Sequence, residues 1–275
     1  MKTFIAIVFL GAFAFPCLAQ FSLEAALGTV LPTGNRFRLA DPILTPPGTI
    51  NISNTIRGLS FGPGIRVGIT GFYQFPSGVG LGLEAHWFQS ATARVEEVTT
   101  AEGVRFSDFS STSYRLFPHL YYQLPTESKL EPFARMGVVF GFNTISEELF
   151  SDLNLTTLNI SRSYRGSISF GYQMKVGGVY KLTEHWGIFS EIFLMAMVWS
   201  GEERVVNSAI QDGVDLLPTL TDAQINTPIL ETIIIDLDEP FDPFFPDQIL
   251  RETIRYTTLG FSIGLRYRFG KQKAS

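Results

Sequence analysis

The chain has 275 residues, of which 45% are hydrophobic and 17% charged, with 25 glycines and a formal net charge of −5. Soluble domains carry about 25% charged residues, so this chain is short of charge, and its negative balance argues against a general nucleic-acid binder. Beyond the N-terminal segment, no stretch approaches the roughly 20 consecutive apolar residues of a membrane-spanning helix.

The N-terminus has the three parts of a secretory signal peptide. Lys2 precedes an apolar run that ends at Phe15, and small residues at Cys17 and Ala19 place cleavage before Gln20. A lipoprotein signal with an acylated Cys17 is the alternative, but bulky residues directly precede that cysteine. We therefore expect simple cleavage, which leaves a mature chain without cysteine and excludes disulfides and thiolate chemistry.

Eight segments after the signal peptide alternate apolar and polar residues with a period of two, which predicts strands with one apolar and one polar face. In chain order they cover residues 21–31, 63–75, 79–89, 113–124, 130–143, 165–182, 186–199 and 257–270. In the last segment the polar face carries glycines, a serine, Arg266 and Arg268, which suits a crowded barrel interior. Its apolar face ends in Tyr267 and Phe269, as in the aromatic girdle of a membrane barrel.

The connections between these segments fall into two classes. Three are short turns, at 76–78, 125–129 and 183–185, and four are long, at 32–59, 96–111, 144–161 and 200–254. Short turns at one end and long loops at the other are typical of outer-membrane barrels. Inside the fourth segment, Pro118 lacks a ladder donor and predicts a local irregularity. The sequence predicts an all-β fold, an eight-stranded antiparallel up-and-down transmembrane β-barrel with four long extracellular loops.

Over residues 20–270, this pattern resembles the small eight-stranded outer-membrane barrels of the OmpX and OmpA transmembrane-domain type. The resemblance implies a signal peptide at 1–19, a barrel at 20–270 and a short periplasmic tail at 271–275, in the outer membrane of a Gram-negative type of cell. One departure is that family members often end on an aromatic residue, whereas Phe269 is followed by further residues.

The soluble alternative is a secreted lipocalin-like calyx, also eight-stranded, with its apolar face inward. A calyx needs charges over its outer face, but here one face is apolar on all eight segments. We therefore prefer the membrane barrel.

The inward rows of the predicted barrel bring several charged side chains to similar depths. This expected lumen charge layer consists of Glu24, Arg66, Glu84, His86, Arg135, Lys175, Glu191 and Arg266. Side chains just fill an eight-stranded barrel, so we do not expect a water channel. Because unpaired charge in a closed lumen is costly, a plug of ion pairs is the preferred interpretation. A proton-linked gate is the alternative.

The sequence predicts no catalytic, cofactor-binding or metal-binding residues. It has no phosphate loop, no GxSxG and no His/Cys metal spacing. Some outer-membrane barrels modify lipid A with a His-x-Ser segment, but none of His86, His119 and His185 is followed two residues later by serine. We therefore expect a protein that is not an enzyme and needs no cofactor.

The fourth long connection, at about 200–254, is acidic: between Glu202 and Ile254 twelve acids stand against two bases. Connections this long within a compact domain are usually functional or disordered. Two apolar clusters could pack on the barrel rim or form a partner-docking surface: Ile233, Ile234, Ile235, Phe241, Phe244 and Phe245. Acids between Asp236 and Asp242 could hold Ca²⁺, but they lack the ordered ligand pattern of a calcium loop.

Together these features predict a monomeric, integral outer-membrane protein that acts through its surface loops, in interaction or in envelope integrity. Its expected partners are outer-membrane lipid and a protein at the extracellular loops, with no nucleic acid. An accessory barrel subunit of an export or assembly complex is the first alternative, and a lipid-modifying outer-membrane enzyme is the second.

Overall fold

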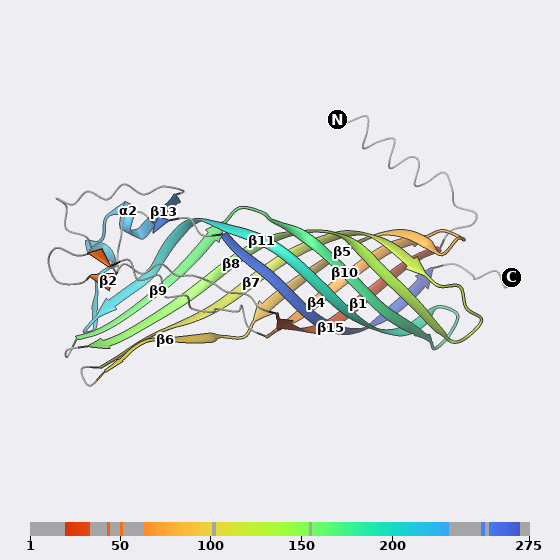
Figure 1. Ribbon diagram of the computed structural model, residues 1–275, viewed down its shortest axis with the longest axis horizontal. Helices are drawn as coiled ribbons and strands as arrows, with labels where there is room; N and C mark the ends of the chain where they lie inside the picture. The colour runs from red at the N-terminus through yellow and green to blue at the C-terminus, as the bar shows by residue number, and fades with distance from the viewer. Residues whose placement is uncertain are drawn as a thin grey trace, which may run out of the picture.

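A computed structural model describes residues 20–33, 43–44, 50–51, 63–100, 103–153, 156–230, 249–250 and 253–269. Eight antiparallel strands form a closed ring, in which each pairs with the next and the last pairs with the first (Figure 1). They are β1 (Gln20–Pro32), β4 (Gly64–Gln74), β5 (Val79–Ser90), β7 (Gly103–Gln123), β8 (Leu130–Leu153), β10 (Ser169–Lys181), β11 (Trp186–Gln211) and β15 (Thr253–Phe269). The predicted eight-stranded antiparallel barrel is confirmed.

Burial along the strands is the reverse of that in a soluble protein. Apolar side chains point outward and are exposed, as at Leu27 (57%), Ile69 (59%) and Leu83 (54%), whereas Glu24 and Arg266 are 1% and 0% exposed. The predicted inward and outward rows are confirmed on all eight strands, since strands place successive side chains on opposite faces. Ser167, which the alternation in the segment 165–182 puts on the inward face, is instead exposed, because β10 begins only after it.

The three short turns lie where the sequence places them, at one end of the barrel. The turn between β4 and β5 contains Gly78 at φ +84°, a conformation that side chains with a Cβ rarely adopt. A Cβ at this position would also lie 2.5 Å from the carbonyl oxygen of Gln123. Aromatic side chains surround this end on the outer face, among them the pairs Phe21–Phe269 and Trp186–Tyr267.

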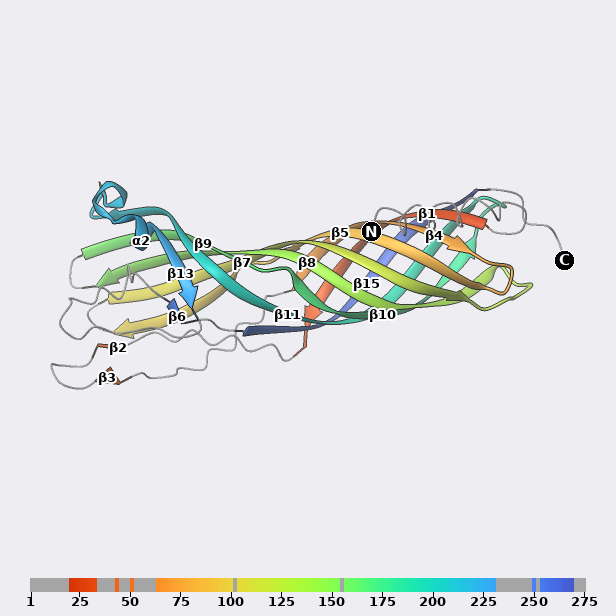
Figure 2. The same ribbon diagram turned by 90° about the horizontal axis from the view of Figure 1, so that it is seen from above.

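At the other end, two predicted loops are wrong. The connection at 96–111 is a hairpin of β6 (Ala93–Thr100) and β7, and the connection at 144–161 is made by β8 and β9 (Thr156–Gly166). Strands β7, β8 and β11 continue past the ring, so one side of the barrel wall is extended by a sheet (Figures 1 and 2). We call this sheet, β6 to β9 with the distal part of β11, the extension.

Much of the fourth long connection is also structured, contrary to the expectation of a loop from 200 onward. After β11 the chain turns at Asp212 and Gly213, both with positive φ, into β12 (Val214–Asp215). A short 3₁₀ helix (Leu217–Thr219), α2 (Asp222–Ile225) and β13 (Asn226–Leu230) follow, and β13 pairs with β11 beside the extension. None of the helices in the described ranges is long and apolar enough to cross a membrane.

The remaining elements are small. They are β2 (Ile43–Leu44), β3 (Ile50–Asn51), which pairs with it, and β14 (Ile249–Leu250), which runs parallel to β13. The predicted signal peptide, the tail at 271–275 and the apolar clusters at 233–235 and 241–245 lie outside the described residues. The acids between Asp236 and Asp242 lie outside them as well.

The apolar outer band ends at the same level on neighbouring strands. On β8 the outward row passes from Phe140 and Phe142 to Thr144, Ser146 and Glu148. On β7 and β11 the outward rows likewise change from apolar to polar, beyond Tyr114 and beyond Val198 respectively. The wall therefore consists of an apolar band followed by an extension with a polar outer face.

The irregularity predicted at Pro118 is confirmed. The β7–β8 pairing passes from Leu116–Phe140 directly to His119–Gly137, and the ladder resumes in the same register. A proline lacks the N–H that the ladder requires, so the gap is local and does not displace the strands.

We expect the outer band and the extension to respond oppositely to a charge. Leu83→Arg places a guanidinium midway along the apolar band and is expected to cost about 2–4 kcal/mol of folding free energy in bilayers. Ser146→Arg makes the same change on the outer face of the extension and is expected to cost much less. Urea titrations of both variants in lipid vesicles measure the difference. Equal losses would show that the band and the extension face the same medium.

Candidate functional site in the barrel interior

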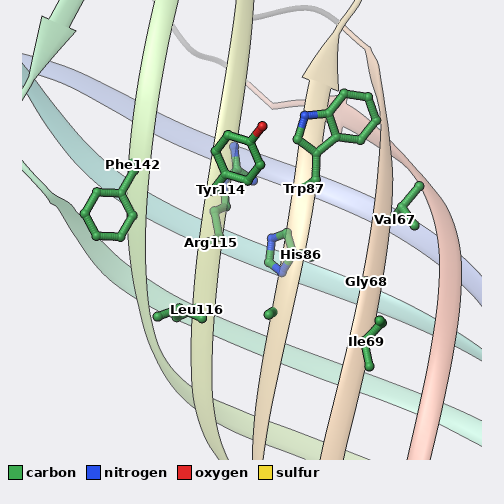
Figure 3. A pocket seen from close by; sticks show the side chains of 10 residues that line it. Val67, Gly68, Ile69, His86, Trp87, Tyr114, Arg115, Leu116 and Phe142 are labelled. Atoms are coloured by element: carbon green, nitrogen blue, oxygen red, sulfur yellow. The ribbon is translucent and has the colours of Figure 1, made fainter.

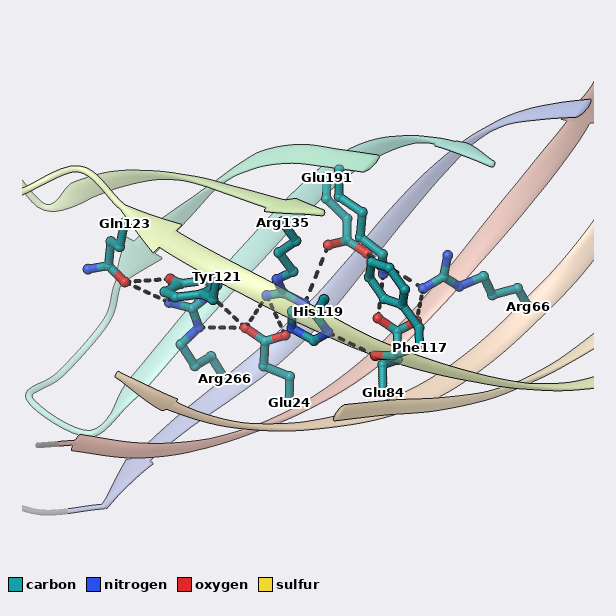
Figure 4. A network of polar contacts seen from close by, with 11 residues as sticks. Glu24, Arg66, Glu84, Phe117, His119, Tyr121, Gln123, Arg135, Glu191 and Arg266 are labelled. Carbon is teal, nitrogen blue, oxygen red and sulfur yellow. Dashed lines mark hydrogen bonds and ion pairs between the residues drawn. The ribbon is translucent and has the colours of Figure 1, made fainter. Parts of the chain in front are cut away.

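The interior of the ring is organised around Glu24 on β1. Arg135 Nη2 donates to Glu24 Oε1 and Oε2 at 2.7 and 2.6 Å, and Arg266 Nε donates to Oε1 at 2.7 Å (Figure 4). Glu24 and Arg266 are directly opposite each other on paired strands, whereas Arg135 comes from β8, which does not pair with β1. One carboxylate thereby neutralises cations from two parts of the wall.

A second group surrounds Glu84 on β5. Arg66 and Lys175 both donate to this carboxylate, and the Nδ1 atom of His86 lies 3.1 Å from Glu84 Oε1. Lys175 also donates to Glu191 Oε1 at 2.9 Å, so it joins two carboxylates from β5 and β11. Charge-assisted contacts of this kind are the stronger hydrogen bonds in proteins, and the one between Lys175 and Glu84 connects β10 and β5, which are not neighbours in the ring.

Glu191 links the two groups. Its carboxylate lies 3.7 Å from Arg66 Nη2 and 3.7 Å from Arg135 Nη1, and it accepts the hydrogen bond from Lys175. Each of these side chains is at most 2% exposed. The structure therefore brings together all eight residues that the sequence places in a lumen charge layer, as one continuous network.

Aromatic rings fill the space around the network. The guanidinium of Arg135 lies 4.6 Å from the ring centre of Phe133, and that of Arg266 lies 4.9 Å from the ring centre of Phe72. Gly260 on β15 makes room for a further ring, since a Cβ there would lie 2.1 Å from Phe193. Cation–π contacts are stronger where water is excluded, so these rings stabilise the buried arginines as well as fill the lumen.

Two interior residues that sequence reasoning left out extend the network toward the short turns. Tyr121 donates to Gln123 Oε1 at 2.6 Å, and Arg266 Nη1 donates to the hydroxyl of Tyr121 at 2.8 Å. Beyond them, Glu131 accepts from Arg268 and lies against Lys181. These residues lie at inward-facing positions of the alternating pattern, and that position could have predicted their place in the lumen.

A separate buried group lies inside the extension, where sequence reasoning expected a loop. Glu147 accepts from Tyr164 at 2.6 Å, from Arg162 at 3.3 Å and from Ser107 at 3.2 Å. Burial raises the pKa of the Tyr164 hydroxyl, and the neighbouring Glu147 carboxylate raises it further. At the outer edge, hydrogen bonds from Arg94 hold the pKa of Asp108 below its usual range.

The three histidines have different surroundings. His86 belongs to the Glu84 group, and His119 is buried with its Nδ1 atom 3.0 Å from the carbonyl oxygen of Phe117. His185, in the short turn at 183–185, is half-buried, and its Nδ1 atom lies 3.0 Å from the carbonyl oxygen of Arg268. In the part of the chain that the structure describes, no three His, Cys, Asp or Glu side chains are grouped to hold a metal ion.

The outer face carries shallow apolar grooves. One, of about 630 Å³, lies above the small residues Gly68 and Ala85 and is bordered by Ile69, Trp87 and Tyr114 (Figure 3). Another lies beside Pro118. Both grooves open into the apolar band, away from the polar interior.

An apolar exterior, a polar interior and a closed ring together indicate that the barrel lies in a membrane. In hydrocarbon every backbone polar group must be paired within the protein, which strands achieve only in a closed barrel. The protein is a transmembrane β-barrel of the outer-membrane type.

No protein-family model matches the sequence, and no curated protein matches it. Among solved structures, the barrel is similar to the outer membrane protein OprG from Pseudomonas aeruginosa, at 16% identity and a TM-score of 0.47, over 92% of this chain and 96% of that one. It is also similar to a major outer membrane protein from Thermus thermophilus (14% identity, TM-score 0.38, 91% and 99% of the chains). Ail of Yersinia pestis is another such structure (11%, TM-score 0.32, 91% and 97%).

The interior network predicts a large loss of stability when one carboxylate is removed. Glu84→Ala leaves Arg66 and Lys175 without this partner in a closed lumen, and we expect a cost of about 3–5 kcal/mol. Glu148→Ala removes an exposed carboxylate from the outer face of the extension and should cost at most about 1 kcal/mol. Refolding titrations in urea compare the two. Equal midpoints would show that Glu84 faces water.

The filled interior also predicts the electrical behaviour of the purified barrel. Rings and ion pairs occupy the lumen from Glu131 to Phe193, so we expect no large stable pore in planar bilayers. Single-channel recording measures this directly. A reproducible porin-like conductance from the wild type would contradict the filled lumen.

Proposed function

We propose that the protein is a non-enzymatic outer-membrane barrel that acts through its extension, in surface interaction or in maintaining the envelope. The observation that carries this proposal is that one side of the wall continues past the apolar band as an ordered sheet. In barrels of this class the short turns face the periplasm, and the proposal adopts this orientation, with the extension on the outer side of the membrane. The filled lumen supports a role outside the barrel rather than transport through it.

The extension has the properties of a surface that meets water or another macromolecule. Its outer face exposes polar side chains on three strands, among them Glu148 on β8, Asn159 on β9 and Asn207 on β11. Its inner face is packed, with Leu149, Ile160 and Val206 in one apolar cluster. The extension is therefore a stable part of the fold that presents a polar outer surface, as a docking module requires.

Shortening the extension tests this proposal. Ile145 and Tyr164 are directly opposite each other on β8 and β9, so residues 146–163 can be replaced by an Asn-Gly turn that joins them. The lipid-facing band is untouched, and we expect the variant to insert as the wild type does. In a strain that lacks the protein, we expect the wild type but not the variant to restore cell-surface binding or exclusion of an impermeant dye. Full restoration by the shortened variant would contradict the proposal.

The alternative of an accessory subunit in an export or assembly complex places the contact on the barrel wall. Copurification from native membranes in mild detergent distinguishes the two. A complex that survives the removal of 146–163 favours the accessory subunit, whereas one that is lost favours the extension. A lipid-modifying enzyme, the third candidate, is tested by mass spectrometry of the lipids of cells with and without the protein.

A further inference from the structure

The outer face of the extension begins where the apolar band ends, so its first rows lie beside the head groups of the surrounding lipid. Tyr114 on β7 is directly opposite Phe142 on β8, and both are exposed at the end of the band next to the extension (Figure 3). The next outward residues on these strands are Thr112 and Thr144, which are directly opposite each other as well. The lipid-facing surface therefore continues without interruption into the outer face of the extension.

Strand register arranges six side chains of this face in two rows across three neighbouring strands. Thr144 and Ser146 on β8 lie in the middle, and each has one residue opposite it on β7 and another opposite it on β9. Five of the six carry a hydroxyl group, and the sixth is an arginine. We call this set the hydroxyl patch, with a first row next to the band of Thr112, Thr144 and Arg165, and a second row of Ser110, Ser146 and Ser163.

Most polar groups of the hydroxyl patch are free to bind another molecule. In the part of the chain that the structure describes, the hydroxyl groups of Ser110, Thr144 and Ser146 have no hydrogen-bond partner, and the guanidinium of Arg165 has none either. Thr144, Ser146 and Arg165 are exposed. The middle of the patch and its one cation therefore face outward with their donors and acceptors unused.

Contacts within the sheet hold the two sides of the hydroxyl patch. Thr112 Oγ1 donates to Gln89 Oε1 at 2.6 Å, and Asn207 Nδ2 donates to Ser163 Oγ at 2.7 Å. Each of these two hydroxyl groups keeps further hydrogen-bonding capacity, because a hydroxyl is both a donor and an acceptor. The patch is thus a fixed surface and not a set of independent side chains.

The charges around the patch favour a negative group on the side of the membrane. Arg165 lies in the row next to the band, and Glu203 on β11, although directly opposite it, makes no ion pair with it. Two other acids of this face come one row further out, at Asp108 and Glu148, and two hydrogen bonds from Arg94 hold Asp108. A free guanidinium binds phosphate through paired N–H donors. Arg165 therefore suits a phosphate at the level of the lipid head groups.

We propose that the hydroxyl patch binds the phosphorylated saccharide head group of a glycolipid in the surrounding leaflet, with Arg165 on the phosphate and the hydroxyl rows on the sugar. This inference rests on the proposed function, because it names a partner for the extension. The patch spans about 10 by 7 Å across its strands and rows, enough for one or two sugar rings. The head group of a phospholipid would use Arg165 but not the hydroxyl rows.

Binding of a purified glycolipid tests the phosphate contact. The protein in detergent micelles is titrated with a phosphorylated lipooligosaccharide, and the bound lipid is counted by native mass spectrometry. Arg165→Gln should weaken binding about tenfold or more, and so should removal of the phosphate groups from the lipid. The two changes together should weaken it no further, because both remove the same contact.

Lys129→Gln is the matched control, since it removes a positive charge from an exposed turn at the other end of the barrel. It should bind the lipooligosaccharide as the wild type does. Equal affinities of the wild type and Arg165→Gln would overturn the proposal, and so would a loss of the same size in Lys129→Gln.

The sugar contact is tested by a change that keeps the shape of the side chain. Thr144→Val removes one hydroxyl group and should weaken lipooligosaccharide binding about threefold to tenfold. It should not change the binding of phosphatidylglycerol, which has a phosphate but no sugar. Thr29→Val makes the same change on the lipid-facing row of β1 and should change neither. If Thr144→Val affects both lipids equally, or neither, the patch does not bind the sugar and the proposal fails.

Function in cells separates this inference from the proposed function. If the variant without residues 146–163 restores the strain fully, the proposed function fails, whatever the glycolipid titrations show. If that variant does not restore the strain, but Arg165→Gln and Thr144→Val bind the lipooligosaccharide as the wild type does, only this inference fails. We expect the shortened variant to be inactive and both point variants to bind more weakly.

Discussion

The pairing of β1 with β15 is the contact on which the rest of the structure depends. Twelve residue pairs join the first strand to the last, from Phe21–Phe269 to Pro32–Thr258. Lipid offers no hydrogen bonds, so an open sheet could not hold its edges in the membrane. Closing eight strands fixes a narrow lumen, and side chains that face it must satisfy one another. The shared use of Glu24 by Arg135 and Arg266 is a direct result, since the ring brings β1, β8 and β15 around one small space.

The same strands serve two solvents, and their side chains change where the solvent changes. On β8, Phe142 is the last apolar residue of the outward row and Thr144 the first polar one, while the inward row continues without a break through Ile145 and Glu147. The interior of the extension therefore continues the interior of the barrel, and Glu147 is its buried carboxylate. The boundary of the hydrocarbon region is visible only on the outer face, where the side chains change from apolar to polar.

The barrel and its charge layer could be predicted from the sequence, because the alternation of inward and outward side chains along a strand does not depend on strand tilt. An inward residue stays inward whatever the register, so Glu84 and Lys175 could be assigned to the lumen. Their contact could not be predicted, because it crosses the lumen between strands that are not neighbours. The extension was missed for a different reason: at Ser146, Glu147 and Glu148 both rows are polar, and the contrast between faces disappears. Ile145 and Leu149 on the inward row are apolar and did indicate a buried face. Glu147 between them and the polar outward row made the segment look like a loop.

The interior ion pairs differ greatly in how far apart their partners lie along the chain. Arg66 and Glu84 are 18 residues apart, within a single hairpin, whereas Arg266 and Glu24 are separated by 242. Contacts between distant residues form slowly, because chain entropy is lost before the contact is gained. Insertion of this barrel is thus expected to end with ring closure, and Arg266 reaches its carboxylate only in that step. Until then the Arg266 guanidinium has no carboxylate partner on β1. The unpaired edges of β1 and β15 must therefore stay in water or in contact with the cell's insertion machinery.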